Sequence, residues 1–215
     1  PPGDLAQMRG LAAGCEAIVH LPAEDPFDRA GDGFGVVSEA AEVAAVAAAA
    51  GSRLIFCSSV LLYADAGDQE LMANDPELDP PAGLRGLADA ELEVFGSPAE
   101  VMLLRLGIVL APDTEMSASL AATLGSDSAA ASSNFLPLLN RQTLAGALAS
   151  LAGGGLHGGW DVVSSVVKLS EVAAEHPEAG AQPASDDPRT DSVWGRSRRV
   201  TGAALREAGA ATEFS

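Results

Sequence analysis

The sequence is short of basic and aromatic residues. Twelve of the 215 residues are Lys or Arg and 30 are Asp or Glu, so the formal net charge is −18. Only 4% of the residues are aromatic, and the chain has one tyrosine, Tyr63, and one lysine, Lys168. A surface this acidic repels a phosphate backbone, which excludes nucleic acid as a partner. A solvated, acid-rich surface is the simplest explanation of the charge.

Metal-binding and membrane-spanning patterns are also missing. His20, His157 and His176 are widely spaced, so we expect no metal site. No apolar run of about 18 residues is free of charges, so we expect no membrane span, and no leader peptide is visible. Cys15 and Cys57 lie in apolar runs, and we expect both to be buried rather than joined in a disulfide. These features favour a cytoplasmic protein.

What the chain does contain is an alternation of apolar runs and Ala/Leu-rich helical patterns. Strands are predicted over 15–21, 53–59 and 101–112, and helices over 5–13, 36–50 and 84–96. Strands that are apolar throughout and alternate with helices indicate a parallel sheet that is covered on both faces. The predicted class is therefore α/β.

The second half of the chain has a different texture. Residues 114–134 are small and polar and predict a loop with weak helix, followed by a helix over 141–154. The segment "GGWDVVSSVVKLSEVAAEHP" predicts one strand and then a helix, and a last helix is expected over 200–210. We expect two units. One covers 1–113, and the other is a small C-terminal α/β lobe with returning elements over 114–215.

The order of five stretches resembles the extended short-chain dehydrogenase/reductase family, of the NAD-dependent epimerase/dehydratase type. That family implies a Rossmann-like, doubly wound parallel sheet, whose N-terminal strands this sequence lacks. Leu5 would end the third strand of that sheet. The five stretches are "GDL" (3–5), "GCEAIVHLPA" (14–23), "RLIFCSSVLLYAD" (53–65), "RLGIVLAPD" (105–113) and "VTGAALREAGA" (200–210).

The resemblance also implies ligand contacts, position by position. Asp4 and Leu5 would lie near the adenine, and Leu21, Pro22 and Ala23 would lie along the cofactor. Ser58 and Ser59 would lie near the nicotinamide, with Leu106, Gly107 and Ile108 behind it. In the lobe it implies Asn134 and Arg189 as substrate contacts. The guanidinium of Arg189 could clasp a phosphate or carboxylate, or form a salt bridge with a neighbouring aspartate.

The family's acid–base pair is missing. In such enzymes a tyrosine and a lysine lie four residues apart, and the lysine lowers the tyrosine pKa. The matching positions here are Ala82 and Gly86, which supply neither proton nor charge. Ser59 matches the family's active-site serine and is the remaining catalytic candidate, although a lone serine at a strand end often caps the backbone. Tyr63 matches a tyrosine with a packing role.

The family's glycine-rich phosphate-binding turn is missing as well. The clusters "GDGFG" (31–35) and "GGGLHGG" (153–159) do not follow a strand and open a helix, as that turn requires. We therefore expect NAD or NADP binding only if the natural protein carries a further N-terminal segment. Otherwise the sheet would have an exposed edge, which a protein partner or a second copy of the chain would cover.

Three functions remain open from the sequence. The favoured one is a degenerate family member with a binding or assembly role. The second is an active but atypical oxidoreductase or epimerase, whose base comes from elsewhere, such as Asp65, Glu91 or a histidine. The third is a purely structural subunit of a larger complex.

Overall fold

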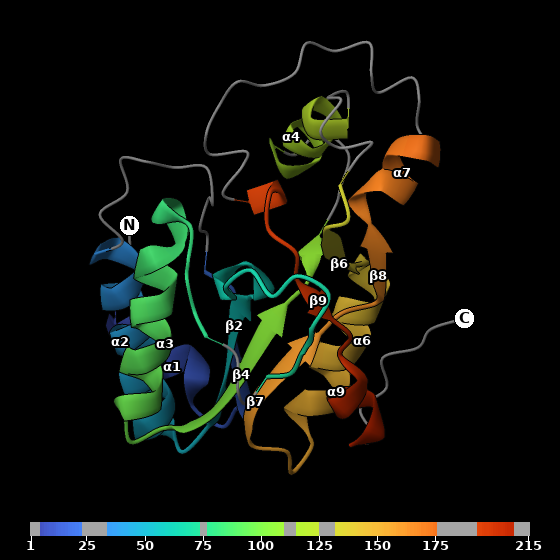
Figure 1. The fold of residues 1–215 in the computed structure, drawn as a ribbon. Coiled ribbons are helices and arrows are strands. Elements are labelled where there is room, and N and C mark those ends of the chain that lie inside the picture. Colours follow the sequence, from blue (N-terminus) through green and yellow to red (C-terminus); the bar gives the residue numbers. More distant parts are fainter. Residues whose placement is uncertain are drawn as a thin grey trace.

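A four-stranded parallel sheet forms the centre of the protein (Figure 1). The computed structural model describes residues 5–22, 34–73, 77–109, 115–124, 132–175 and 193–208. The strand order is β1-β2-β4-β7, and every neighbouring pair is parallel. The predicted parallel pairing of the second strand with the third is confirmed. The bounds are β1 (Ala17–His20), β2 (Arg53–Ser59), β4 (Glu100–Leu106) and β7 (Gly158–Val162).

Helices cover both faces of this sheet, as the sequence predicts (Figure 1). On one face lie α1 (Leu5–Ala12), α2 (Phe34–Ala50) and α3 (Arg85–Gly96). On the other lie α6 (Arg141–Ala152) and α9 (Ala203–Glu207). Alanine has the highest helix propensity, which favours the Ala-rich α2, and Gly51 follows that helix at a φ of +66°.

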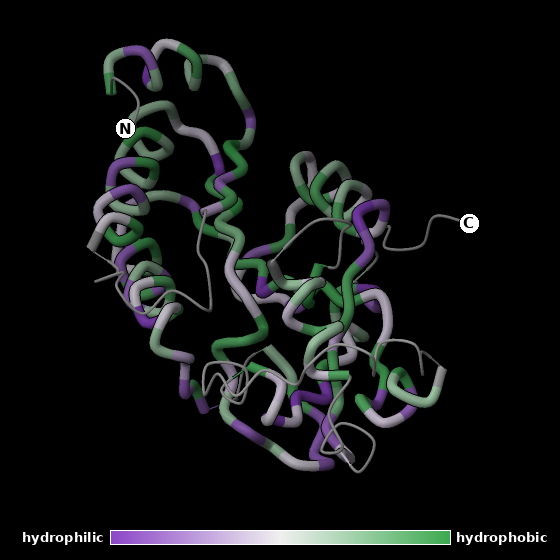
Figure 2. The backbone as a smooth tube through the Cα atoms, turned by 90° about the horizontal axis from the view of Figure 1, so that it is seen from above, coloured by the Kyte–Doolittle hydropathy of each residue, from purple (hydrophilic) through white to green (hydrophobic). Residues whose placement is uncertain are grey.

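Two cores result from the alternation of side chains along the strands. Leu54 and Phe56 pack with α2 and α3, whereas Ile55 and Met102 pack with α6. All four side chains are fully buried, and burying a side chain of this size stabilises the fold by about 1.5–3 kcal/mol. Figure 2 shows that hydrophilic residues recur between hydrophobic ones along the outer helices.

Smaller elements lie beyond the carboxyl ends of the main strands. A three-stranded sheet has the order β5-β6-β8, and β3 pairs with β9. The helices α4 and α7 lie above these strands in Figure 1. The bounds are β3 (Glu70–Leu71), β5 (Ile108–Val109), β6 (Phe135–Leu139), β8 (Ser165–Lys168), β9 (Arg199–Val200), α4 (Glu115–Leu124), α7 (Leu169–Glu175), and the 3₁₀ turns η1 (Val60–Leu62) and η2 (Ala82–Leu84).

Three predictions about elements are wrong. Leu5 begins α1 and does not end a strand. The predicted strand 101–112 is broken at Gly107, where the chain of β6 passes so close that an added Cβ would lie 3.0 Å from the Pro137 carbonyl oxygen. Its end, 110–112, lies outside the described residues. The segment 158–168 forms two strands instead of one, because the N–H of Ser164 donates to the carbonyl of Leu138 at 2.8 Å and turns the chain toward β6.

Two further expectations also need correction. The stretch 114–134 contains the regular helix α4, although a loop with weak helix was expected. Cys15 is exposed, because it lies in the turn before β1, whereas Cys57 is buried as predicted. Among the described residues no helix is long and apolar enough to cross a membrane.

Candidate functional site

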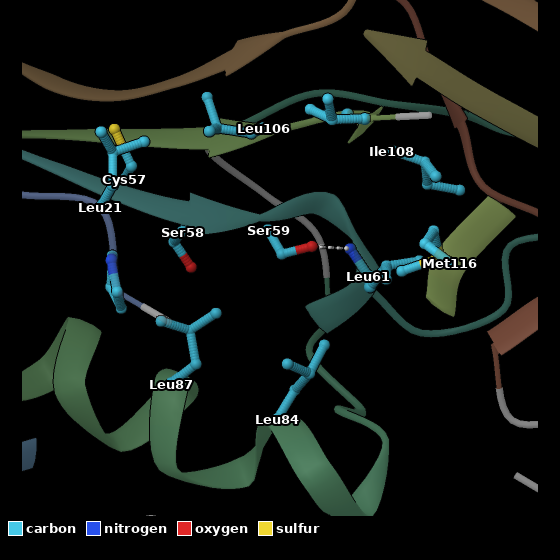
Figure 3. A pocket seen from close by; sticks show the side chains of 13 residues that line it. Leu21, Cys57, Ser58, Ser59, Leu61, Leu84, Leu87, Leu106, Ile108 and Met116 are labelled. Atoms are coloured by element: carbon cyan, nitrogen blue, oxygen red, sulfur yellow. Dashed lines mark hydrogen bonds between the residues drawn. The ribbon is translucent and has the colours of Figure 1, made fainter. Parts of the chain in front are cut away.

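A pocket of about 310 Å³ lies at the carboxyl ends of β1, β2 and β4 (Figure 3). The carboxyl ends of parallel strands are the usual place for ligands in open α/β sheets. Side chains from α3 and α4 complete its walls. The lining residues are Leu21, Pro22, Cys57, Ser58, Ser59, Leu61, Leu84, Leu87, Leu106, Gly107, Ile108, Val109 and Met116.

The pocket brings together most of the described residues that the sequence implies as cofactor contacts. Those that line it are Leu21, Pro22, Ser58, Ser59, Leu106, Gly107 and Ile108. Leu5 is not among the lining residues. The predicted contacts Asp4, Ala23 and Arg189 lie outside the described residues.

Asn134, a predicted substrate contact, is also absent from the pocket lining. Its side-chain amide donates to the backbone carbonyl of Trp194 at 3.1 Å, and its own backbone carbonyl accepts from the N–H of Leu169 at 2.9 Å. Asn134 therefore ties the start of β6 to two distant segments of the chain.

Ser59 caps the turn that follows its strand. Its hydroxyl oxygen accepts a hydrogen bond of 3.1 Å from the N–H of Leu61, as the N-cap of η1 (Figure 3). This is the capping use of a strand-end serine. Among the described residues, no base accepts a hydrogen bond from the Ser59 hydroxyl, so nothing there activates it as a nucleophile.

Ser58 differs from its neighbour. Its side chain is on the α3 side of β2, and Figure 3 shows its oxygen directed into the space between β2 and Leu87. The residue is 6% exposed, and its hydroxyl has no hydrogen-bond partner among the described residues. Buried hydroxyls are usually bonded, so this one is conspicuous.

The α3 wall of the pocket is apolar. Leu84 and Leu87 face the pocket from this side (Figure 3). Ala82 is exposed in η2, and Gly86 is buried in the first turn of α3, so the two positions straddle a junction between helix types. Cys57 adds no reactive thiolate, because burial raises the pKa of its thiol to about 12.

A second cluster, of buried ionisable residues, lies beside α3. The hydroxyl of Tyr63 donates to Asp161 Oδ1 at 2.6 Å and accepts from the Arg105 guanidinium at 3.2 Å. Arg105 also forms a two-pronged ion pair with Glu91, at 3.0 and 2.6 Å, and its guanidinium carbon lies 5.0 Å from the Tyr63 ring centroid. The sequence pattern alone does not bring these four residues together.

Burial dominates the electrostatics of this cluster. It raises the pKa of the Asp161 carboxyl to about 6, although the Tyr63 hydrogen bond and the Arg105 charge both act to lower it. Burial and the neighbouring Asp161 raise the pKa of Tyr63 well above its ordinary value. For Arg105, desolvation is outweighed by Glu91, so its pKa is raised and the guanidinium stays charged. Tyr63 is therefore a protonated structural donor.

Of the bases that the sequence left open for an atypical reaction, Glu91 and Asp65 have other partners, His20 lies away from the pocket, and His176 lies outside the described residues. Glu91 is bound to Arg105, and Asp65 Oδ1 accepts from the N–H groups of Gly67 at 3.0 Å and Ser197 at 3.2 Å. His20 is buried against the Phe56 ring, and desolvation lowers its pKa. None of the three lines the pocket.

The fold is that of NAD-dependent epimerases and dehydratases, and the resemblance seen in the sequence is confirmed at that level. A double mutant of the dTDP-glucose 4,6-dehydratase DesIV from Streptomyces venezuelae, bound to NAD, matches with a TM-score of 0.74 and 16% identity. The match covers 99% of this chain and 73% of that one.

Two further solved structures agree. The human epimerase family protein SDR39U1 with NADPH has a TM-score of 0.68 at 19% identity, over 96% of this chain and 82% of that one. The Thermus thermophilus UDP-glucose 4-epimerase with NAD has a TM-score of 0.67 at 16% identity, over 99% and 78%. No protein-family model and no curated protein matches the sequence.

The described residues fit only part of a dinucleotide. The free Ser58 hydroxyl and the apolar walls suit a small ring with a polar group. The described lining of the pocket, however, holds no charged side chain that could pair with a pyrophosphate. We therefore assign no reaction step through a nicotinamide to this pocket.

Proposed function

We propose that this protein is an atypical relative of the NAD-dependent epimerases and dehydratases that has lost the Tyr/Lys acid–base pair and serves in binding or assembly rather than catalysis. The observation that carries the proposal is the apolar α3 wall, where Leu84 and Leu87 face the pocket. Proton transfer needs a group within hydrogen-bond reach whose pKa is near the working pH. Leucine side chains supply no such group.

The hydroxyl groups at the pocket support the same proposal. Ser59 caps η1, and among the described residues Ser58 has no hydrogen-bond partner that could take its proton. Tyr63 and Glu91 are engaged in the ionisable cluster outside the pocket. NAD or NADP binding belongs to the proposal only with a phosphate-binding segment beyond the described residues.

An assembly role draws support from the sheet edge. Among the described strands, β1 has a neighbour on one side only, which is β2. The exposed Val19 and Leu21 lie on or next to this strand. We propose that a protein partner, a second copy or another part of the natural protein covers this edge.

We also propose that the chain divides into two units, 1–113 and 114–215. In this division β7 belongs to the second unit by sequence but pairs with β4 in the main sheet.

The proposal is tested by binding and activity measurements on the natural full-length protein. Binding of NAD and NADP is measured by calorimetry, and turnover is measured with nucleotide sugars such as UDP-glucose and dTDP-glucose. Cofactor binding without turnover agrees with the proposal. Turnover near ordinary enzyme rates, about 1 s⁻¹ or faster, would instead establish an active enzyme with a different acid–base group. Neither binding nor turnover would favour a purely structural subunit.

A further inference from the structure

The pocket above Ser58 differs in chemistry from a nucleotide site, and its ligand class follows from that difference. Resting on the proposed binding role, we propose that this pocket takes a neutral, largely apolar small molecule that carries one hydrogen-bonding group, and that Ser58 binds that group. The molecule would enter between β2 and α3, against the faces of Leu84 and Leu87.

The pocket walls exclude a charged ligand. Among the described residues, the lining has no Lys, Arg, His, Asp or Glu, and apart from two serines and a cysteine its side chains are hydrocarbon, thioether or glycine. A charge that leaves water for such a site loses its hydration and gains no counter-charge. The net charge of −18 adds repulsion against any anion that approaches. A neutral molecule faces neither cost.

The number of available polar groups limits the ligand to about one strong hydrogen bond. The Ser59 hydroxyl keeps a proton to donate, but it is directed toward the Leu61 N–H, from which its oxygen accepts (Figure 3), and Cys57 is only a weak partner. The Ser58 hydroxyl is buried and has no partner in the part of the chain that the structure describes, and a buried unpaired hydroxyl carries an unfavourable desolvation cost. A ligand oxygen at this point would remove that cost. A sugar, with several hydroxyls, would leave most of its own groups unpaired.

The size of the pocket agrees with a small molecule. Its volume of about 310 Å³ is at the lower end of the range for ligand pockets, about 300–1,000 Å³. A molecule built on a single ring fills such a volume, whereas a whole dinucleotide does not enter it.

The test uses a pair of probes of nearly equal shape. Acetophenone has a carbonyl where ethylbenzene has a methylene, so the difference in their affinities isolates the hydrogen bond. Both are titrated into the protein and into Ser58→Ala, with binding followed by chemical-shift changes of the Leu84 and Leu87 methyl groups. We expect both probes to bind, and Ser58→Ala to weaken acetophenone about tenfold while leaving ethylbenzene within twofold.

Ser59→Ala is the matched control, because the neighbouring serine lines the same pocket but has its oxygen occupied. It should leave the affinity ratio of the two probes unchanged. Leu87→Trp fills the pocket and should abolish binding of both probes. Failure of both probes to bind the unmodified protein, or an equal loss of both in Ser58→Ala, would overturn the inference.

NAD⁺ and UDP-glucose serve as charged competitors in the same titration. Displacement of acetophenone by either at similar concentration would overturn the inference in favour of a nucleotide ligand. That outcome is distinct from failure of the proposed function, which is read from cofactor binding and turnover of the full-length protein. Selective binding of acetophenone without displacement would support the neutral ligand class.

Discussion

The hydroxyl of Tyr63 donates a 2.6 Å hydrogen bond to the carboxyl group of Asp161, 98 residues further along the chain. Both residues are buried, with Tyr63 at 0% and Asp161 at 6% exposure. The bond joins the turn after β2 to β7, so the only tyrosine of the chain ties the end of the sheet's second strand to its last. A tyrosine in this role supports structure and donates no proton to a ligand.

Asp161 makes the stability of the fold depend on pH. Because its folded pKa of about 6 lies above the ordinary 3.8, the folded state binds this proton more tightly than the unfolded state. The contribution is therefore fully present below about pH 4 and is lost as the pH rises through about 6. The gap between the two pKa values corresponds to about 3 kcal/mol.

We expect Asp161→Asn to remove this dependence. The unfolding free energy of the unmodified protein minus that of Asp161→Asn should fall as the pH rises from 4 to 7, measured by urea unfolding. Asp89→Asn, at an exposed position of α3, is the control and should leave the profile unchanged. A difference between wild type and Asp161→Asn that is flat, or that rises with pH, would contradict a raised pKa.

The second prediction concerns the ion pair of Arg105 and Glu91, which is almost wholly buried. Arg105→Met removes the cation and leaves Glu91 as an unpaired buried charge, so we expect a loss of about 3–5 kcal/mol in unfolding free energy. Adding Glu91→Gln removes the stranded charge and should restore part of that loss. A double-mutant cycle in which the two changes simply add would show that the pair is not coupled.

The third prediction concerns the break between β4 and β5. A Cβ at position 107 would lie 3.0 Å from the Pro137 carbonyl oxygen and 3.2 Å from the Leu139 Cβ, and neither neighbour can move without shifting β6. Gly107→Ala should therefore destabilise the fold by about 1–3 kcal/mol, the usual cost of overpacking. Gly159→Ala is the control, since nothing lies within 4 Å of its added Cβ. Equal thermal stability of the two variants would argue against close packing of β6 on this turn.

The main sheet could be predicted because each of its features is local. Apolar runs such as 53–59 can be recognised without knowledge of their partners, and a helix between successive strands indicates a crossover connection, which joins parallel strands. The pocket could be anticipated for the same reason, because the carboxyl ends of parallel strands converge. Ser58 and Ser59 end β2, and Gly107 follows β4, so all three lie at this edge of the sheet.

The smaller sheet could not be predicted. Phe135–Leu139 contains Pro137, and a proline argues against a central strand because it has no N–H to donate, yet β6 lies between β5 and β8. The ionisable cluster was missed although its signal is visible. Arg105 interrupts an apolar strand and Glu91 lies on the apolar face of α3, and a buried charge at either position requires a partner. The identity of that partner depends on tertiary packing, which a single sequence does not contain.

The last prediction compares the two adjacent serines at the end of β2. Ser59→Ala removes the acceptor for the Leu61 N–H. Loss of an N-cap typically lowers the unfolding free energy by about 0.5–2 kcal/mol. Because η1 is a short turn, we expect a loss of about 1 kcal/mol or less for Ser59→Ala. Ser58→Ala removes a buried hydroxyl that has no partner among the described residues, so no hydrogen bond is lost and an unfavourable desolvation is relieved. We therefore expect Ser58→Ala to leave the unfolding free energy unchanged or to raise it, opposite in sign to the effect of Ser59→Ala. Chemical unfolding of both variants without ligand measures the pair. A loss of more than about 1 kcal/mol in Ser58→Ala would mean that its hydroxyl already has a partner, and the pocket would then lack the free polar group on which ligand recognition depends.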